Sequence, residues 1–201
     1  VAAEKILIVY AHQSAGSFNA AAKDAAVKVL TSQGCKVEVS DLCHEVQREV
    51  KDAEHFQNGE ETMLKWKEGR LSADITEEHR KPYDAVVVIF QVSSPAVLLN
   101  GWMDRVLTLG FAYTSEIIHL VVFLQEKKAM LSFTTGSHES ISANGDHCRY
   151  NGNLHYCGFQ VWAPQIFWAP NHIPSEARWS HASCLNVEPD MTTVHWCDCF
   201  H

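Results

Sequence analysis

The segment "ILIVYAHQSAGSFN", residues 6–19, decides the fold that we expect for this chain. Its apolar and β-branched first half predicts a buried strand over Lys5 to Tyr10. In its polar second half, Ser17 can N-cap a helix that runs from Phe18 to about Gln33, and Gly34 is a typical C-terminal stop. A buried strand that leads directly into a helix is the first part of a strand–helix–strand unit, so the segment indicates a parallel sheet.

Predicted strands and helices continue to alternate along the chain. Because strands that alternate with helices imply right-handed crossovers, we expect an α/β fold, a doubly wound parallel sheet of about five strands with helices on both faces. Further strands are predicted over 36–42, 85–90, 127–133 and 158–168, the last interrupted by Pro164. Helices are predicted near 61–67, from Asp74 or Thr76 with Pro82 past the end, and over 96–109 before Gly110.

Ligands of such sheets bind beyond the carboxyl ends of the strands. The loops expected at that edge are the His12 loop, residues 91–94 and the loop that begins at Thr134. Function is therefore sought in these three loops.

Length and composition exclude several classes of protein. The 201 residues, 46% hydrophobic and 20% charged, fit one folded domain, expected over residues 1–186, with a C-terminal tail over 187–201. The net charge of -8 argues against a nucleic-acid partner, because an acidic surface repels phosphates. No apolar run reaches membrane-spanning length, so we expect no membrane association.

The cysteines and the first residues bear on the compartment. The seven cysteines are odd in number and form no regular framework, which is typical of a reducing compartment. The N-terminal residues lack the pattern of a secretory signal. We therefore expect a cytoplasmic protein.

The His12 loop has two interpretations. A helix that begins after Ser17 has unpaired N–H groups on Phe18, Asn19 and Ala20, and these together with the helix dipole favour a phosphate. The Ser17 hydroxyl and the His12 imidazole could donate to the same phosphate. The alternative is an ordinary strand-to-helix connection with an exposed histidine.

The loop that begins at Thr134 is similarly open. Its hydroxyls and main-chain N–H groups, over Thr134 to Ser137, could bind the polar rim of a flat heterocycle, or form an ordinary turn. The chain has no Walker loop and no GxGxxG pattern, which argues against nucleoside triphosphate hydrolysis and a standard dinucleotide fold. It also has no serine elbow and no HExxH helix.

The C-terminal "HWCDCFH" contains side chains that bind zinc or copper. On an extended chain His195, Cys197, Cys199 and His201 point to one side. The spacing is not a usual zinc pattern, and an unstructured chain end is the alternative.

The opening segment is one of several motifs that occur in order over nearly the whole chain. The others are "QGCKVEVSDL", "GWMDRVL", "GFAY", "TTG", "NGD", "LHYCGFQV" and "APQI". Together they resemble the FAD-dependent NAD(P)H quinone reductases, most weakly over residues 43–65. The resemblance implies a flavodoxin-like, flavin-binding domain and a homodimer with flavin at the subunit interface. It also implies two-electron hydride transfer to a quinone by a ping-pong route, from NAD(P)H or dihydronicotinamide riboside.

The resemblance favours the phosphate interpretation of the His12 loop and assigns site residues. The resemblance implies these FAD-binding residues: His12, Phe18, Asn19, Ala20, Ala21, Thr134, Thr135, Gly136, Ser137 and Arg178. Ser17 joins them because of its place in the loop pattern. The substrate-lining residues it implies are Tyr113, Thr114 and Ser115, and Asn144 is implied near the reacting ring.

Departures from the family pattern fall around the same pocket. "FQVSSPAVLLNGW" lacks the family's Pro-Leu-aromatic-Trp element, "TTGSHESISANGD" lacks a tyrosine, and the aromatic segment before "LHYCGF" is reduced. The glutamate that accompanies the FAD-binding arginine is Asn171. These differences leave a second hypothesis: a degenerate member with weak or no flavin binding and no catalysis, acting through its dimer surface.

The family's structural metal site is also altered. Asn151 and Thr192 stand where its first histidine and its cysteine occur, which leaves His155 as the expected metal ligand, for zinc or copper.

Overall fold

The computed structural model describes residues 3–45, 64–65, 67–93, 97–113, 123–136, 147–172, 185–187 and 194–196, and the structure is discussed for these residues. The strands of its main sheet all pair in parallel, in the order β2-β1-β3-β4-β5, with β6 also on β4. Their bounds are Lys5–Ala11 for β1, Lys36–Asp41 for β2, Val87–Ser93 for β3, Lys128–Thr135 for β4, Gln160–Val161 for β5 and Gln165–Trp168 for β6. The predicted parallel α/β sheet is confirmed.

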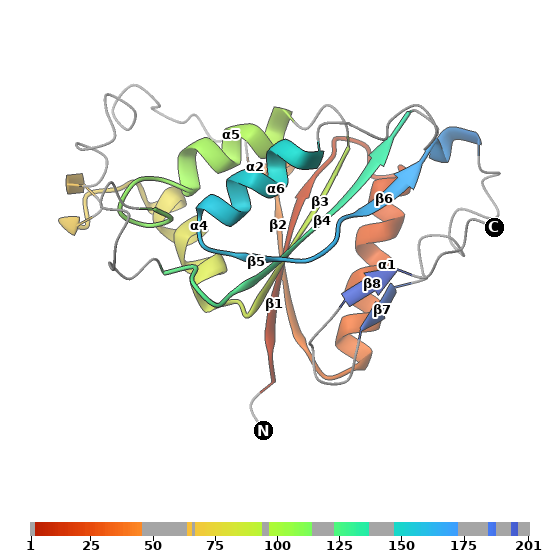
Figure 1. The fold of residues 1–201 in the computed structure, drawn as a ribbon, viewed down its shortest axis with the longest axis horizontal. Coiled ribbons are helices and arrows are strands. Elements are labelled where there is room, and N and C mark those ends of the chain that lie inside the picture. Colours follow the sequence, from red (N-terminus) through yellow and green to blue (C-terminus); the bar gives the residue numbers. More distant parts are fainter. Residues whose placement is uncertain are drawn as a thin grey trace.

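Helices cover both faces of this sheet (Figure 1). Their bounds are Phe18–Ser32 for α1, Leu42–Glu45 for α2, Ala73–Asp84 for α4, Val97–Val106 for α5 and His147–Tyr156 for α6. A short 3-10 turn spans Pro170–His172. None of the helices in the described ranges is long and apolar enough to cross a membrane.

Alternation along β1 explains why the sheet needs two layers of helices. Ile6 and Ile8 pack with Ala22, Ala26 and the rest of the buried side of α1. Leu7 and Val9 face the other way and pack with α5 and α6 residues. Each face of the sheet is therefore apolar, which is the reason for the continuous apolar run in the sequence.

The end of α1 follows the predicted signal. Gly34 adopts φ +86°, a left-handed conformation that other residues rarely adopt, and its N–H donates to the Thr31 carbonyl at 3.0 Å. The N–H of Cys35 reaches back to the Leu30 carbonyl at 3.1 Å. The chain can then turn into β2, as expected.

Three element boundaries differ from the sequence prediction. Leu42 begins α2 instead of ending the second strand, because the Asp41 carboxylate accepts the N–H of Cys43 at 3.1 Å and caps a new helix. Pro82 lies inside the last turn of α4, where it removes one helical hydrogen bond at most and its ring is buried. The helix predicted to reach 109 ends at Val106, since the Thr108 carbonyl accepts the N–H of Phe111 in a turn.

The last predicted strand is divided as its proline indicated. β5 and β6 lie on either side of Pro164, and both pair with β4. In contrast, α6 was not predicted, because its polar sequence has little helical periodicity. The helix expected near 61–67 lies largely outside the described residues.

An antiparallel hairpin follows the sheet. It consists of β7, Leu185–Val187, and β8, Val194–Trp196, and β7 lies beside α1 (Figure 1). The expected boundary between residues 186 and 187 falls within β7, so the division into domain and tail stays a prediction.

Candidate functional site

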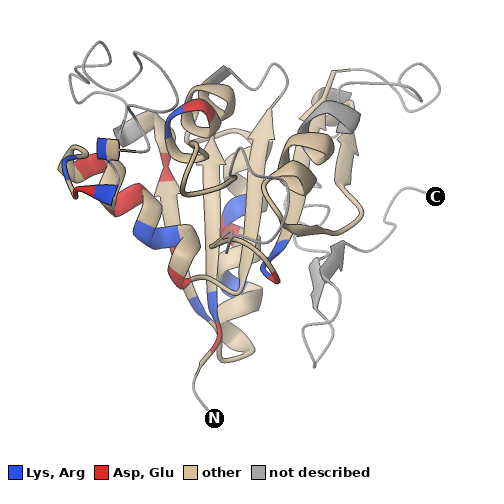
Figure 2. Ribbon diagram, turned by 60° about the vertical axis from the view of Figure 1, so that its left-hand side comes forward, with Lys and Arg blue, Asp and Glu red and all other residues tan. Residues whose placement is uncertain are grey.

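The carboxyl ends of β1, β3 and β4 lie side by side. The register pairs Ala11 with Val92 and Ser93 with Thr134. The loops predicted to carry function therefore begin at neighbouring points of one sheet edge. Among the described residues, acidic and basic side chains gather along α4 (Figure 2).

The N-terminus of α1 has the geometry expected of an anion site. The Ser17 hydroxyl accepts the N–H of Ala20 at 3.1 Å, so it caps the helix. Within the described part of the chain, no acceptor bonds the N–H groups of Phe18 and Asn19, which point out of the helix end. These two donors and the helix dipole fit a phosphate.

His12 lies next to this helix end with one ring nitrogen already used. Its Nδ1 accepts the N–H of Ser14 at 3.1 Å. In the neutral imidazole the proton is then on Nε2, which can donate to a ligand.

A cavity of about 650 Å³ opens beside these residues. Two of the predicted cofactor residues, His12 and Ala20, line it. Lys23, which sequence reasoning missed, also lines it; its Nζ lies 3.0 Å from an Asp24 carboxylate oxygen and 5.0 Å from the centre of the Tyr10 ring. Burial raises the pKa of Tyr10, against the smaller opposite effect of the Ser17 side chain. Lys23 follows Ala20 by three residues, so the two lie on one face of α1, and this spacing was the signal for it.

The predicted ring-binding loop is held by two neighbours. Thr134 accepts a 2.9 Å hydrogen bond from the amide of Asn19, and that amide's oxygen accepts a 2.9 Å bond from Gln91. The Thr135 carbonyl accepts the N–H of Ala169 at 2.8 Å, which ties β4 to the segment after β6. Gly136 is exposed, and Ser137 lies outside the described residues. The sequence prediction named the loop over residues 91–94 but gave Gln91 no role. Nothing in the sequence shows that the Gln91 side-chain amide is buried and bonded to Asn19.

Part of the predicted substrate wall is also described. The half-buried ring of Tyr113 lies 5.3 Å from the ring of Tyr156, which is 67% exposed. Burial raises the pKa of Tyr113, so its phenol stays protonated at neutral pH. Tyr156 was not predicted as a site residue. Thr114, Ser115, Asn144 and Arg178 lie outside the described residues, so their roles stay predictions.

The structure does not test the metal prediction. His155 is exposed on α6, and Cys157 nearby is buried, which raises its thiol pKa to about 11. Within the described ranges, no three His, Cys, Asp or Glu side chains are close enough to hold a metal. Thr192, Cys197, Cys199 and His201 lie outside those ranges.

Comparison with known proteins matches this arrangement. Residues 4–183 match a family described as having a flavodoxin-like fold. The chain is 40% identical to the human ribosyldihydronicotinamide dehydrogenase [quinone], over 98% of both chains. The chain belongs to the flavodoxin-like quinone reductase family. The family predicted from the sequence motifs is therefore confirmed, including the particular likeness to ribosyldihydronicotinamide dehydrogenase [quinone].

One further relative supports the quinone reductase family, and one solved structure supports the fold. The NAD(P)H dehydrogenase [quinone] 1 of Cavia porcellus is 40% identical, over 88% of this chain and 73% of its own length. The solved structure of an NAD(P)H:quinone oxidoreductase from Methanothermobacter marburgensis has a TM-score of 0.65 and 23% identity, covers 90% of this chain and 96% of its own, and supports the fold.

The alignment also bears on the shortened loops. It extends over 229 residues with the human relative, more than the 201 residues of this chain. The quinone reductase relative therefore has segments that this chain lacks.

Proposed function

We propose that this chain is a quinone oxidoreductase that uses FAD. The observation that carries the proposal is the N-terminus of α1, where no described residue bonds the Phe18 and Asn19 N–H groups and the Asn19 side chain contacts Thr134. The chain is also 40% identical to a quinone dehydrogenase. A dinucleotide with a diphosphate is the ligand that we propose there, because no described residue bonds these donors or the His12 Nε2, and His12 and Ala20 line a cavity.

The residues then have distinct tasks. The N–H groups of Phe18 and Asn19, with His12, hold the diphosphate, and Ser17, Ala20 and Ala21 shape that turn. Arg178 binds the adenine end. Thr134, Thr135, Gly136 and Ser137 contact the flavin ring, next to Asn144. FAD held there would supply two-electron chemistry between a reduced nicotinamide compound and a quinone, the two substrates entering in ping-pong order.

Tyr113 presents a flat aromatic surface for the nicotinamide or quinone ring, with Thr114 and Ser115 beside it. Tyr156 extends this surface, since the two rings are 5.3 Å apart and tilted by 51°. By family resemblance, the protein is a cytoplasmic homodimer that completes each flavin site across the interface. His155 is the remaining candidate for a zinc or copper ligand.

The second hypothesis, a degenerate member with weak or no flavin binding and no catalysis that acts through its dimer surface, draws on one observation. The alignment with the human relative is longer than this chain, so the chain lacks some of that relative's segments. The identity over nearly the full length and the intact helix end favour the active enzyme instead.

Titration of the purified protein with FAD tests the proposal. We expect a shift in the flavin absorbance bands that saturates at one FAD per chain, and weaker binding of FMN, which lacks the diphosphate and adenosine. The loaded protein is then expected to oxidise NADH or dihydronicotinamide riboside when a naphthoquinone is present. Absence of any spectral shift at saturating FAD would favour the degenerate alternative.

A further inference from the structure

Three buried side chains at the carboxyl edge form one hydrogen-bonded series. Gln91 of β3 is 1% exposed, Asn19 of α1 is 3% exposed and Thr134 of β4 is 7% exposed. Gln91 and Thr134 lie at the ends of the strands that lead into two of the predicted functional loops, and Asn19 lies in the helix that follows the third. Because buried polar groups need partners, the series fixes how these elements meet.

The series has a direction. The amide nitrogen of Gln91 donates to the amide oxygen of Asn19 at 2.9 Å. The amide nitrogen of Asn19 then donates to the hydroxyl oxygen of Thr134, also at 2.9 Å. Since the Thr134 oxygen accepts from Asn19, its own hydrogen must point to another acceptor.

In the part of the chain that the structure describes, the Thr134 hydroxyl donates no hydrogen bond. Thr134 is nevertheless buried, next to the end of β4 at the ligand edge. A buried donor without a partner is costly, so this hydroxyl is set to donate to something that arrives.

We infer that Gln91 is a positioning residue that, through Asn19, makes Thr134 a hydrogen-bond donor to an acceptor atom of the bound flavin ring. The inference rests on the proposed function, which supplies the flavin. The ring has carbonyl oxygens and ring nitrogens at its polar rim, and a donor there stabilises the electron-rich reduced ring more than the oxidised ring. Loss of the donor therefore lowers the reduction potential of the bound flavin.

Substitutions along the series separate this role from simple packing. Thr134→Val keeps the shape but removes the hydroxyl, and Thr134→Ser keeps the donor. Gln91→Met removes the donor to Asn19 with little change in volume, so the Asn19 amide is free to turn over. Gln91→Glu offers only acceptor oxygens when ionised, so the Asn19 amide nitrogen turns to it and the Thr134 hydrogen turns inward.

Ser132 supplies the matched control. It is fully buried on the same strand and pairs in register with Gln91, but its hydroxyl bonds none of the three side chains. Ser132→Ala therefore removes a neighbouring buried hydroxyl without touching the series.

The test compares FAD-loaded wild type and variants by FAD titration, by the reduction potential measured against redox dyes, and by unfolding of the apoprotein. We expect Thr134→Val and Gln91→Met to weaken FAD binding by roughly 3- to 10-fold and to lower the potential. Thr134→Ser is expected to restore both values, and Ser132→Ala to leave both unchanged. If Gln91→Met does not fold, Gln91→Glu carries the same expectation.

The role of Gln91 is overturned if Thr134→Val lowers the reduction potential of the bound flavin but a folded Gln91 variant leaves that potential unchanged. Equal losses in Ser132→Ala would also overturn it, because they would trace the effect to packing. Wild type that takes up no FAD is a different failure, since it removes the proposed function and the inference with it.

Discussion

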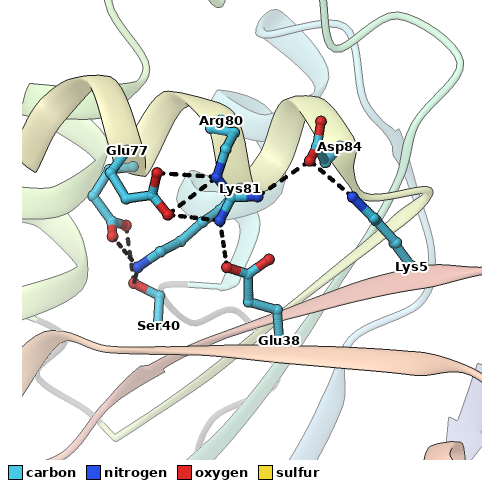
Figure 3. Close-up of polar contacts among 8 residues, drawn as sticks. Lys5, Glu38, Ser40, Glu77, Arg80, Lys81 and Asp84 are labelled. Carbon is cyan, nitrogen blue, oxygen red and sulfur yellow. Dashed lines mark hydrogen bonds and ion pairs between the residues drawn. The ribbon is translucent and has the colours of Figure 1, made fainter.

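The indole N–H of Trp102 donates a 2.7 Å hydrogen bond to a carboxylate oxygen of Glu78 in the protein interior. The same carboxylate pairs with the Lys81 ammonium and accepts a 2.9 Å bond from the Ser40 hydroxyl. Lys81 extends from α4 toward Ser40 of β2, whereas Arg80 makes its ion pairs with Glu77, Glu38 and Asp84 (Figure 3). The buried ion pair of Glu78 and Lys81 thus joins α4 to β2 and α5.

Loss of the Glu78 carboxylate leaves the Lys81 charge buried without its counter-ion. We expect Glu78→Ala to lower the free energy of unfolding by about 3–5 kcal/mol, measured by urea denaturation. Glu77→Ala is the control on the same helix, because the Glu77 side chain is 53% exposed and pairs with Arg80 at the surface. Its effect should be much smaller, since water screens that pair. Equal losses at the two positions would contradict a buried role for Glu78.

His79 makes stability depend on pH. Its Nε2 bonds the Val106 carbonyl at 2.9 Å, its ring stacks on Phe111 at 4.0 Å, and burial lowers its pKa from 6.5 to about 4, despite the opposing effects of Val106 and Glu78. The unfolded chain therefore binds a proton more readily than the folded protein between those values, and stability falls as the pH falls through that window. Between pH 6.5 and pH 5 the loss is roughly 1.5 kcal/mol.

His79→Gln isolates this contribution. Glutamine can still donate to the Val106 carbonyl but does not titrate. Urea denaturation at pH 7 and pH 5 should show a smaller difference for the variant than for wild type. The same pH dependence in both proteins would assign the effect to other groups.

The fold was largely predictable because its signals are local. The apolar run before His12, the Ser17 cap and Gly34 each act within a few residues, and the structure has a strand, a helix start and a helix end where they indicate. Pro82 and Leu42 were placed wrongly because tertiary packing and the Asp41 cap outweigh their local preferences.

The site was predictable only in outline. The three loops were expected at one edge from topology, and Asn19 and Thr134 do meet there. Gln91 and Tyr156 were missed, because they act through neighbours 72 and 43 residues away in sequence, Asn19 and Tyr113, and no spacing rule joins such pairs.

The Cys157 thiol should resist modification in the folded protein. Burial raises its pKa to about 11, so it is protonated at pH 8, and its side chain is 5% exposed. Because the thiolate is the nucleophile, iodoacetamide should label it at least about 100-fold more slowly in the native protein than in urea. Mass spectrometry of the peptide that contains Cys157 follows both rates, and the unfolded chain is its own control. Similar rates would mean that the base of α6 opens readily.

Ser17 allows helix capping and diphosphate binding to be separated. Its hydroxyl accepts the Ala20 N–H, so Ser17→Ala should lower stability by about 1 kcal/mol, seen as a lower melting temperature. Ser17→Asp retains an acceptor and should keep the stability of wild type. Its carboxylate, however, lies at the helix end where the Phe18 and Asn19 N–H groups are unpaired, so it competes with the diphosphate and repels it. FAD should therefore bind more weakly to Ser17→Asp than to Ser17→Ala, although the aspartate variant is the more stable protein. If the FAD titration shows that Ser17→Asp binds FAD as tightly as wild type, the diphosphate does not lie at the N-terminus of α1.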